Sequence, residues 1–454
     1  MSKKISDRKT HLLLFVFFTG LFLGINISFW AKADEPVHKY LDYFHNVYQL
    51  VKTDYVDVPE TKEIFYGAIR GMLKSLDDPF TRFLDEKAYA ELREITAGRF
   101  YGVGVEISIR DSEVVVIAPI EDSPAMKAGI SAGDVIVRVN DEPIKGKSLE
   151  SVEKMIKGIP GSKVKIFIRR EGYDDVLEYD IERAPVRIKS VEYETINDTG
   201  TGYIKIKNFG NDTTRDIINA LKYFNENKIA KLVLDVRNNP GGLLTSAIEI
   251  ADLFLDKERV IVSTKGRGAK DMEKTFKAEN GPVYKGKVMI LVNRGSASAS
   301  EILSAAIKDN GRGKLIGEKT FGKGSVQKTF NLDENVGIAI TVARYYTPSG
   351  DLIHKKGITP DYTVQFKELS AEDRAAVRIV EKNRLVDKFV KKDLAYSDET
   401  KKMFQEFLKQ QNVTISPETA NFLLKSGVYR FKKKPLYDLE FDSQLQAALK
   451  NINS

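Results

Sequence analysis

The segment KVMILVNRGSASASEILSAAIKDNG, from Lys287 to Gly311, contains an apolar stretch followed directly by a helical pattern. The opening run KVMILVN is typical of a buried strand. From Ser298 the apolar residues recur at helical spacing, and Gly311 is a typical residue for closing a helix. A short buried strand that leads into a helix is the repeating unit of a layered α/β domain.

The same alternation precedes this segment. The expected strands are GYIKIKNF (202–209) and KLVLDV (231–236), and the expected helices are TTRDIINALKYFNEN (213–227) and LLTSAIEIADLFL (243–255). RNNPGG (237–242) reads as the turn between the second strand and its helix. The pattern therefore predicts a layered α/β core.

Upstream of this core, short strands dominate from about Gly98. The segments are YGVGVEISI (101–109), EVVVIAPI (113–120), SPAMKAGISAGDVIVRVN (123–140), LESVEKMIKG (149–158) and KVKIFIRR (163–170). Their order resembles a PDZ domain. That resemblance implies that a peptide adds as an extra strand and that its terminal carboxylate binds the loop of Tyr101, Gly102, Val103 and Gly104. A β-domain without a ligand is the alternative.

Two helical regions flank these parts. Residues 36–97 carry two helical patterns, the second ended by Asp77–Pro79, and the chain after Gln365 is mostly helical, charged and without a motif. Apolar faces on such helices are usually core, but they could also support a homo-oligomer.

The N-terminus indicates export. Four cations at positions 3, 4, 8 and 9 precede an apolar run from Leu12 to Trp30, and AKA (31–33) follows. This run is longer than most cleaved signals, although AKA resembles a cleavage site. We expect an exported, periplasmic or otherwise extracytoplasmic protein with a signal peptide or, slightly favoured, an uncleaved transmembrane anchor in the inner (cytoplasmic) membrane.

Composition excludes several classes of site. The 454 residues include no cysteine and four histidines, which excludes disulfides and thiolate catalysis and argues against a histidine metal cluster. The net charge is +7, but the cations are spread among acids, so a solvated surface is favoured over nucleic-acid binding.

The serine run at the strand–helix junction has two interpretations. Ser298 and Glu301 have the spacing of a helix capping box. The same junction would also expose a nucleophile beside helix N–H groups that can stabilise an oxyanion. The run alone favours capping.

The stretch GEKTFGKGSVQ (317–327) begins like a phosphate-binding loop. The position that should bind magnesium is Gly324, however, and strand-like alternation follows where a helix is needed, so nucleotide binding is rejected. A serine hydrolase needs a base, and His354 is the only histidine in the α/β part. Lys323 between two glycines is the other candidate, because burial can make a lysine neutral near pH 7.

Four motifs together resemble the carboxyl-terminal processing (tail-specific) serine proteases: LDVRNNPGG (234–242), GSASASEI (295–302), GEKTFGKGSVQ (317–327) and YYTPSGDLIHKKGITPD (345–361). The resemblance covers about residues 36–365. It implies that Ser298 is the nucleophile, that Lys323 is the general base and that Gln327 orients this lysine. It also implies an oxyanion site of the Ala299 N–H and one N–H of Gly241 or Gly242, with no metal or cofactor.

The implied fold is a multidomain α/β protein with a layered, crotonase/Clp-like protease core, a β-rich PDZ domain and helical ends. The expected boundaries are 1–33 (signal peptide or anchor), 34–97 (helical), 98–183 (PDZ domain), 184–365 (protease core) and 366–454 (helical). The implied enzyme is a Ser-Lys endopeptidase that cleaves exported proteins at or near C-termini captured by the PDZ domain. A non-proteolytic PDZ scaffold and a His354-based hydrolase are the alternatives.

Overall fold

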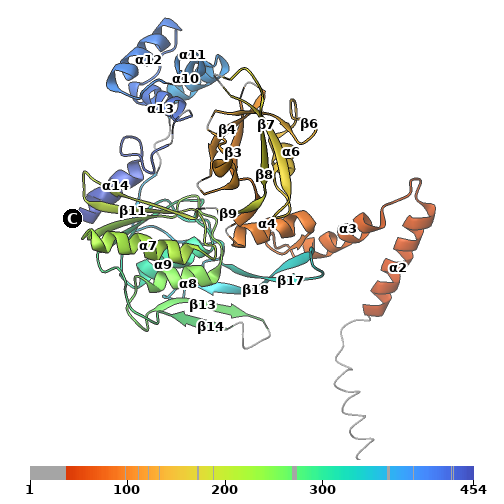
Figure 1. The fold of residues 1–454 in the computed structure, drawn as a ribbon. Coiled ribbons are helices and arrows are strands. Elements are labelled where there is room, and N and C mark those ends of the chain that lie inside the picture. Colours follow the sequence, from red (N-terminus) through yellow and green to blue (C-terminus); the bar gives the residue numbers. More distant parts are fainter. Residues whose placement is uncertain are drawn as a thin grey trace, which may run out of the picture. The chain divides into compact units, whose positions relative to one another are not determined.

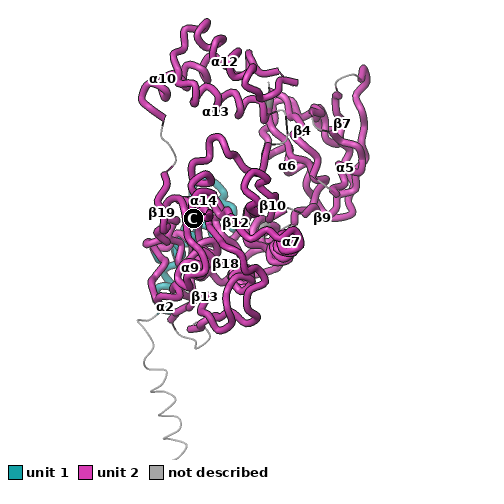
Figure 2. The backbone as a smooth tube through the Cα atoms, turned by 90° about the vertical axis from the view of Figure 1, so that its left-hand side faces the viewer, with its two compact units in different colours: residues 1–76 teal, residues 77–454 magenta. Residues whose placement is uncertain are grey.

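The computed structural model describes residues 37–97, 99–110, 112–120, 122–131, 133–170, 173–187, 189–267, 273–365, 369–391, 393–430, 432 and 434–453. The chain divides into two compact units, one ending at Leu76 and the other beginning at Asp77 (Figure 2). Within the described ranges, no helix has the length and apolar character needed to cross a membrane. The expected signal or anchor at 12–30 lies outside these ranges.

The first unit is a pair of helices, α2 (Val37–Asp54) and α3 (Thr61–Lys74). Aromatic rings join them, since the ring centroid of Phe65 lies 5.1 Å from that of Tyr48 and 6.1 Å from that of Phe44. Both helices follow the predicted apolar spacing, and these ring contacts show that apolar residues of one helix pack against the other.

The α/β core of the second unit is built on a six-stranded sheet in the order β10-β11-β12-β15-β16-β19. Its strands are Val191–Ile196 (β10), Thr201–Ile206 (β11), Lys231–Asp235 (β12), Lys287–Val292 (β15), Lys314–Gly317 (β16) and Tyr362–Thr363 (β19). Only the edge strand β10 is antiparallel to its neighbour among these pairs. The sheet confirms the expected layered core.

Helices cover both faces of this sheet (Figure 1). Side chains of α7 (Thr213–Glu226), α8 (Leu244–Asp252) and α9 (Ala299–Asp309) share one core cluster with Leu232 and Leu234. Val233, between these two leucines, packs in the opposite cluster with α14 (Ser443–Asn453). Successive side chains of this strand therefore pack into the helical layers on opposite faces of the sheet. The last helix of the chain, expected in a separate C-terminal region, thus packs on the core.

A second sheet of the same unit has the order β1-β18-β13-β14, with β17 also paired to β18. Its strands are Arg82–Leu84 (β1), Val260–Gly266 (β13), Lys274–Lys277 (β14), Ser325–Asn331 (β17) and Gly337–Tyr346 (β18). The strand predicted after Gly324 is therefore confirmed as β17.

Strand β1 lies in a region that was expected to be entirely helical. It pairs with residues 337–339 of β18, and Leu84 is fully buried. Helix α4 (Glu86–Ala97) follows it, and the Tyr89 hydroxyl donates to Asn331 Oδ1 at 2.6 Å. The apolar residues after Pro79 are thus explained by burial on a sheet, and not by helical periodicity.

The PDZ region has the expected order of strands and helices. Its elements are β2 (Arg99–Gly102), β3 (Val105–Arg110), β4 (Glu113–Pro119), α5 (Pro124–Ala128), β5 (Val135–Val139), β6 (Glu142–Pro143), α6 (Leu149–Ile156), β7 (Lys163–Arg169), β8 (Leu177–Glu182) and β9 (Ala184–Arg187). Strands β3, β4, β5, β7 and β8 form one antiparallel sheet, to which β6 adds at β5. The expected first strand is interrupted between Gly102 and Val105, and β2 pairs with β9 instead.

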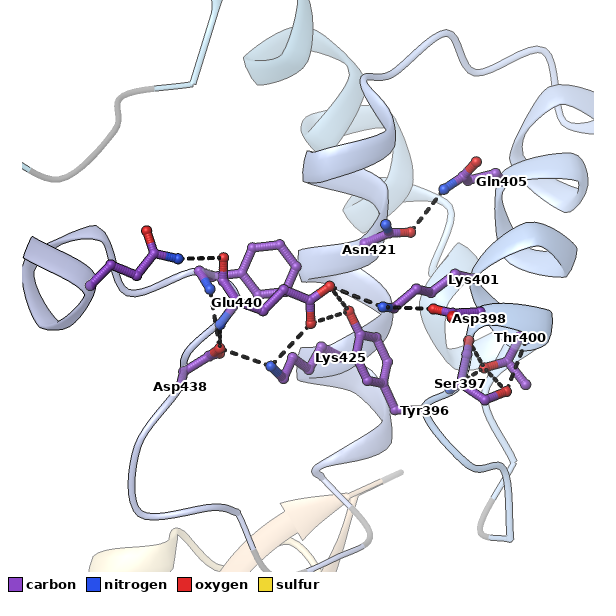
Figure 3. A network of polar contacts seen from close by, with 12 residues as sticks. Tyr396, Ser397, Asp398, Thr400, Lys401, Gln405, Asn421, Lys425, Asp438 and Glu440 are labelled. Carbon is purple, nitrogen blue, oxygen red and sulfur yellow. Dashed lines mark hydrogen bonds and ion pairs between the residues drawn. The ribbon is translucent and has the colours of Figure 1, made fainter. Parts of the chain in front are cut away.

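The C-terminal helices are α10 (Ala371–Lys382), α11 (Leu385–Phe389), α12 (Asp398–Gln410) and α13 (Pro417–Val428), around their own apolar cluster. A polar network ties the segment before α14 to this bundle (Figure 3). The Tyr396 hydroxyl donates to Glu440, and Lys401 and Lys425 pair with the same carboxylate at 3.1 and 3.3 Å. Burial, with Glu440 beside it, raises the pKa of Tyr396, so this hydroxyl stays a donor.

Candidate active site

Ser298 occupies a strained turn between β15 and α9. Its backbone has φ 56° and ψ −115°, a combination that residues other than glycine rarely adopt, and the residue is 8% exposed. Such strain persists only where surrounding contacts fix it, and it is common at reactive positions. The junction thus has the geometry expected for a nucleophile.

The neighbouring serines are used in structural hydrogen bonds. Ser296 Oγ donates to the carbonyl of Val236 at 2.8 Å, and Ser300 Oγ donates to the carbonyl of Asn239 at 2.9 Å. Both bonds fasten the serine run to the turn after β12. The two flanking serines therefore have structural roles.

The PGG turn lies directly against the serine junction. A Cβ atom on Gly241 would lie 2.7 Å from Ser298 Cβ and 2.9 Å from the Ala299 nitrogen, and φ here is +103°. Only glycine fits this approach. The Gly241 N–H donates to Asn239 Oδ1 at 2.9 Å. By contrast, the N–H groups of Gly242 and Ala299 donate to no residue that the structure describes.

Glu301 connects the serine junction to the lysine loop. Its carboxylate is fully buried and accepts two backbone N–H groups at one oxygen, those of Ser298 at 2.9 Å and Lys323 at 2.8 Å. The other oxygen accepts the Gly322 N–H at 2.7 Å and the Thr320 hydroxyl at 2.6 Å. Burial raises the pKa of Glu301, and these four donors counteract that rise.

The sequence suggested Glu301 only as a capping residue. The capping interaction is present, since its carboxylate accepts the N–H of Ser298. Its second role depends on a loop that lies beyond the helix in sequence, so helix-cap spacing could not reveal it.

The lysine loop lies close to a second backbone segment. A Cβ on Gly324 would lie 2.2 Å from the backbone nitrogen of His354, which excludes any larger residue. The Lys355 N–H donates to the Gly322 carbonyl at 2.8 Å. The glycines around Lys323 therefore permit a close backbone approach.

The Lys323 amine lies 4.9 Å from the ring centroid of Phe80. Burial lowers the pKa of Lys323, and Arg82 lowers it further, while Glu301 and Asp78 act in the opposite direction. A lowered pKa is what a lysine base requires. Sequence reasoning missed Phe80 and Arg82, because they precede the PDZ domain and show only a turn signal.

Two expected contacts are not formed in this structure. Among the described residues, the backbone N–H of Lys323 donates to Glu301. No hydrogen bond joins the Lys323 amine to Ser298 Oγ or to Gln327 in this described part of the chain. The Gln327 amide nitrogen donates instead to Ser325 Oγ at 2.8 Å and to Thr341 Oγ1 at 3.2 Å.

His354 lies beside the lysine loop, in the turn after β18. Its Nδ1 atom is buried and has no partner among the described residues. Burial lowers its pKa, with Arg344 and Lys355 acting in the same direction and Asp78 against them. Its backbone packs on Gly324, so the segment has a structural role there.

The expected carboxylate loop of the PDZ domain is compact. Its carbonyl groups are engaged, since Gly104 O accepts from Ser123 Oγ at 3.0 Å and Val103 O accepts from the Ala125 N–H at 2.8 Å. The N–H groups of Val103 and Gly104 donate to no described residue. Gly102 is buried, and Tyr101 is exposed at the rim.

Comparison with known proteins identifies these parts. A family model described as peptidase family S41 matches residues 200–364, a PDZ domain model matches 115–170, and a model of the activating protease CtpB N-terminal domain matches 28–88. Among solved structures, the photosystem II D1 C-terminal processing protease shares 35% identity over 71% of this chain and 86% of that chain, with a TM-score of 0.42.

Relatives in bacteria match most of the chain. A carboxy-terminal-processing protease of Bartonella bacilliformis is 37% identical over 359 residues, which cover 77% of this chain and 82% of that protein. A probable CtpA-like serine protease of Staphylococcus saprophyticus is 35% identical over 374 residues, covering 80% of this chain and 75% of that protein. The chain therefore belongs to the carboxy-terminal-processing proteases of peptidase family S41, as a serine peptidase that carries a PDZ domain.

Proposed function

We propose that this peptidase uses Ser298 as nucleophile and Lys323 as general base to cleave exported proteins at or near their C-termini. The observation that carries this assignment is the buried Glu301 carboxylate. One of its oxygens accepts the N–H groups of both proposed catalytic residues, so the two backbones are held in one frame.

The chemistry follows from these positions. Neutral Lys323 takes the proton of the Ser298 hydroxyl as Oγ attacks the scissile carbonyl carbon. The negative charge that develops on the carbonyl oxygen is held by the Ala299 N–H and a PGG N–H. We favour Gly242 for the second donor, because the N–H of Gly241 is already bonded to Asn239. The lysine then protonates the leaving amine.

Water completes the cycle. Lys323, neutral once it has given its proton to the amine, activates a water molecule that attacks the acyl-enzyme and releases Ser298. In the structure the amine of Lys323 faces Phe80, so productive catalysis requires a side-chain movement toward Ser298. Catalytic hydrogen bonds often tighten only when substrate binds. Gln327 would orient the lysine after the same movement.

The PDZ domain would supply the preference for C-termini. The N–H groups of Val103 and Gly104, which donate to no residue in the described ranges, suit a carboxylate, and Gly102 and Tyr101 would flank it. The protein's export, an N-terminal membrane anchor at 12–30, and a homo-oligomer remain part of this proposal. The first two rest on the sequence pattern, and the third on the exposed apolar residues of α2.

The test uses the purified full-length protein and an unstructured protein substrate with an apolar C-terminus. Ser298→Ala and Lys323→Ala should each abolish cleavage, while His354→Ala should retain it. Cleavage by either of the first two variants at the parent rate would refute the dyad. Loss in His354→Ala with activity in Lys323→Ala would favour the histidine-based hydrolase. Binding of the substrate without cleavage by the parent would favour the scaffold.

A further inference from the structure

We propose that the segment Asp78–Arg82, which precedes the PDZ domain, completes the active site by placing Phe80 as a cover over the amine of the base Lys323. Phe80 is a positioning residue, because it acts on the reaction only through the lysine. This inference rests on the proposed function. The segment lies outside residues 200–364, which the peptidase family model matches, so the proposed active site includes a residue from beyond that range.

The segment is anchored on its C-terminal side by strand β1. Arg82, Phe83 and Leu84 pair with residues 337–339 of β18. The side chains of Phe83 and Leu84 are buried. The Tyr89 hydroxyl adds a hydrogen bond to Asn331, the last residue of β17. The segment that carries Phe80 is therefore attached to the sheet that contains β17, the strand that begins just after the lysine loop.

On the other side of Phe80, a turn is closed by Asp78. Its carboxylate accepts the Phe80 N–H at 3.0 Å and the Thr81 hydroxyl at 2.7 Å. Thr81 Oγ1 in turn accepts the Thr341 N–H from β18 at 3.0 Å. These three bonds fix the backbone around Phe80, from which its ring contacts the Lys323 amine.

The same bonds reach the proposed orienting residue. Thr341 Oγ1 accepts from Gln327 Nε2 at 3.2 Å, and the backbone N–H of the same Thr341 donates to Thr81, whose hydroxyl donates to Asp78, so Thr341 links Gln327 to the turn. The turn that carries Phe80 is thus linked both to the Lys323 amine, through the ring, and to Gln327, through these hydrogen bonds. This arrangement is more than a chance contact between one ring and one surface lysine.

The ring has two opposite effects on the amine. Its negative face attracts the ammonium form, and its bulk excludes the water that would solvate that form. Three charged groups act on the amine from the packed elements: Arg82 of β1, Asp78 of the turn and Glu301 of α9. A further titratable group, His354, interacts with Asp78, and burial lowers its pKa. Burial is the largest influence on the pKa of Lys323, and it favours the neutral amine. We therefore expect exclusion of water to outweigh the attraction.

Two substitutions separate these effects. Phe80→Ala removes both the ring face and the bulk, whereas Phe80→Leu keeps most of the bulk and removes the ring face. Phe330→Ala is the matched control, because Phe330 lies 5.3 Å from the Lys328 amine on β17, in the same kind of contact but away from the site.

The measurement is kcat/KM against pH for the full-length protein. In Phe80→Ala the acidic limb should move to higher pH by about one unit, so that activity at pH 7 falls about tenfold and recovers at alkaline pH. In Phe80→Leu the limb should stay in place or move slightly to lower pH, and Phe330→Ala should match the parent. A loss in Phe80→Ala that is equal at every pH would reduce the ring to a structural role and overturn the proposal.

A second readout does not depend on catalysis. In the Ser298→Ala background, the rate at which an amine-acylating reagent modifies Lys323 is followed against pH by mass spectrometry of the lysine-loop peptide. Replacing Phe80 by alanine should shift this profile to higher pH by a similar amount, and an unmoved profile would overturn the inference. If Lys323→Ala remained active, the proposed function would fail, and the acylation profile would still decide whether Phe80 covers the amine.

Discussion

Glu301→Gln tests the frame on which the proposed dyad depends. The substitution keeps the size of the side chain and replaces one carboxylate oxygen by an NH2 group. The Thr320 hydroxyl, whose oxygen already accepts the Ile358 N–H at 2.6 Å, can turn its proton away and accept a second bond from the new NH2 group, but the Gly322 N–H would lose its acceptor. We expect the amide to turn its NH2 group toward these two residues and to keep its oxygen for Ser298 and Lys323.

The magnitude follows from these contacts. A hydrogen bond to a charged group contributes about 1.5–3 kcal/mol, and a buried unsatisfied donor costs about 1–3 kcal/mol. The bond from the Gly322 N–H is lost, and the bonds from Ser298 and Lys323 then go to a neutral acceptor. In the other direction, the cost of burying the Glu301 charge no longer opposes folding. The free energy of unfolding should therefore fall by about 2–3 kcal/mol. A shift of the lysine loop by about 1 Å should lower kcat about 100-fold.

The same substitution should also shift the pH dependence of kcat/KM in a definite direction. The Glu301 carboxylate raises the pKa of Lys323, so its removal should lower that pKa further. The acidic limb of kcat/KM should consequently move to lower pH, although the maximum falls. This direction is opposite to the one expected for Phe80→Ala.

The assays are urea unfolding and kcat/KM against pH. Glu318→Gln is the control, since Glu318 pairs at 3.3 Å with Arg294, whose side chain is 80% exposed. Its loss should change the free energy of unfolding by less than about 0.5 kcal/mol and leave activity intact. A Glu301→Gln protein with the parent's kcat, or with a limb moved to higher pH, would refute the reasoning.

Three further outcomes are expected. Ser298→Gly should be inactive yet more stable than the parent in urea, by about 1–3 kcal/mol, because glycine adopts φ 56° without strain; lower stability would contradict this. Asp442→Ala should lower the free energy of unfolding by about 3–5 kcal/mol. Asp442 contacts the buried guanidinium of Arg237 at 2.6 Å, and without it Asp235 is the carboxylate that remains beside that charge. Lys323→Met should be more stable than the parent at pH 7, because the folded-state pKa of this lysine is lowered and the parent's stability rises with pH between that value and the unfolded value of 10.5. Urea midpoints at pH 7 and at pH 9.5 should therefore differ less in Lys323→Met than in the parent.

The local pattern of the sequence determined a large part of this protein. Apolar runs and helical spacing predicted β12, β15, α7 and α9, because each element buries one face whose period is visible in its own residues. The order of four motifs indicated the family and placed Ser298 at a strand–helix junction, which the backbone geometry supports. The alternation after Gly324 likewise predicted β17 and excluded a phosphate-binding loop.

The tertiary structure alone decided what surrounds the candidate site. Glu301 looked like a helix cap until the lysine loop folded onto its carboxylate. Phe80 showed only as part of a turn, and its place over Lys323 depends on β1 pairing with a strand far along the chain. Similarly, α14 packs on the core sheet from the end of the sequence. These contacts join residues that are distant in sequence, so no local period records them, and only packing and hydrogen bonding in the folded chain bring them together.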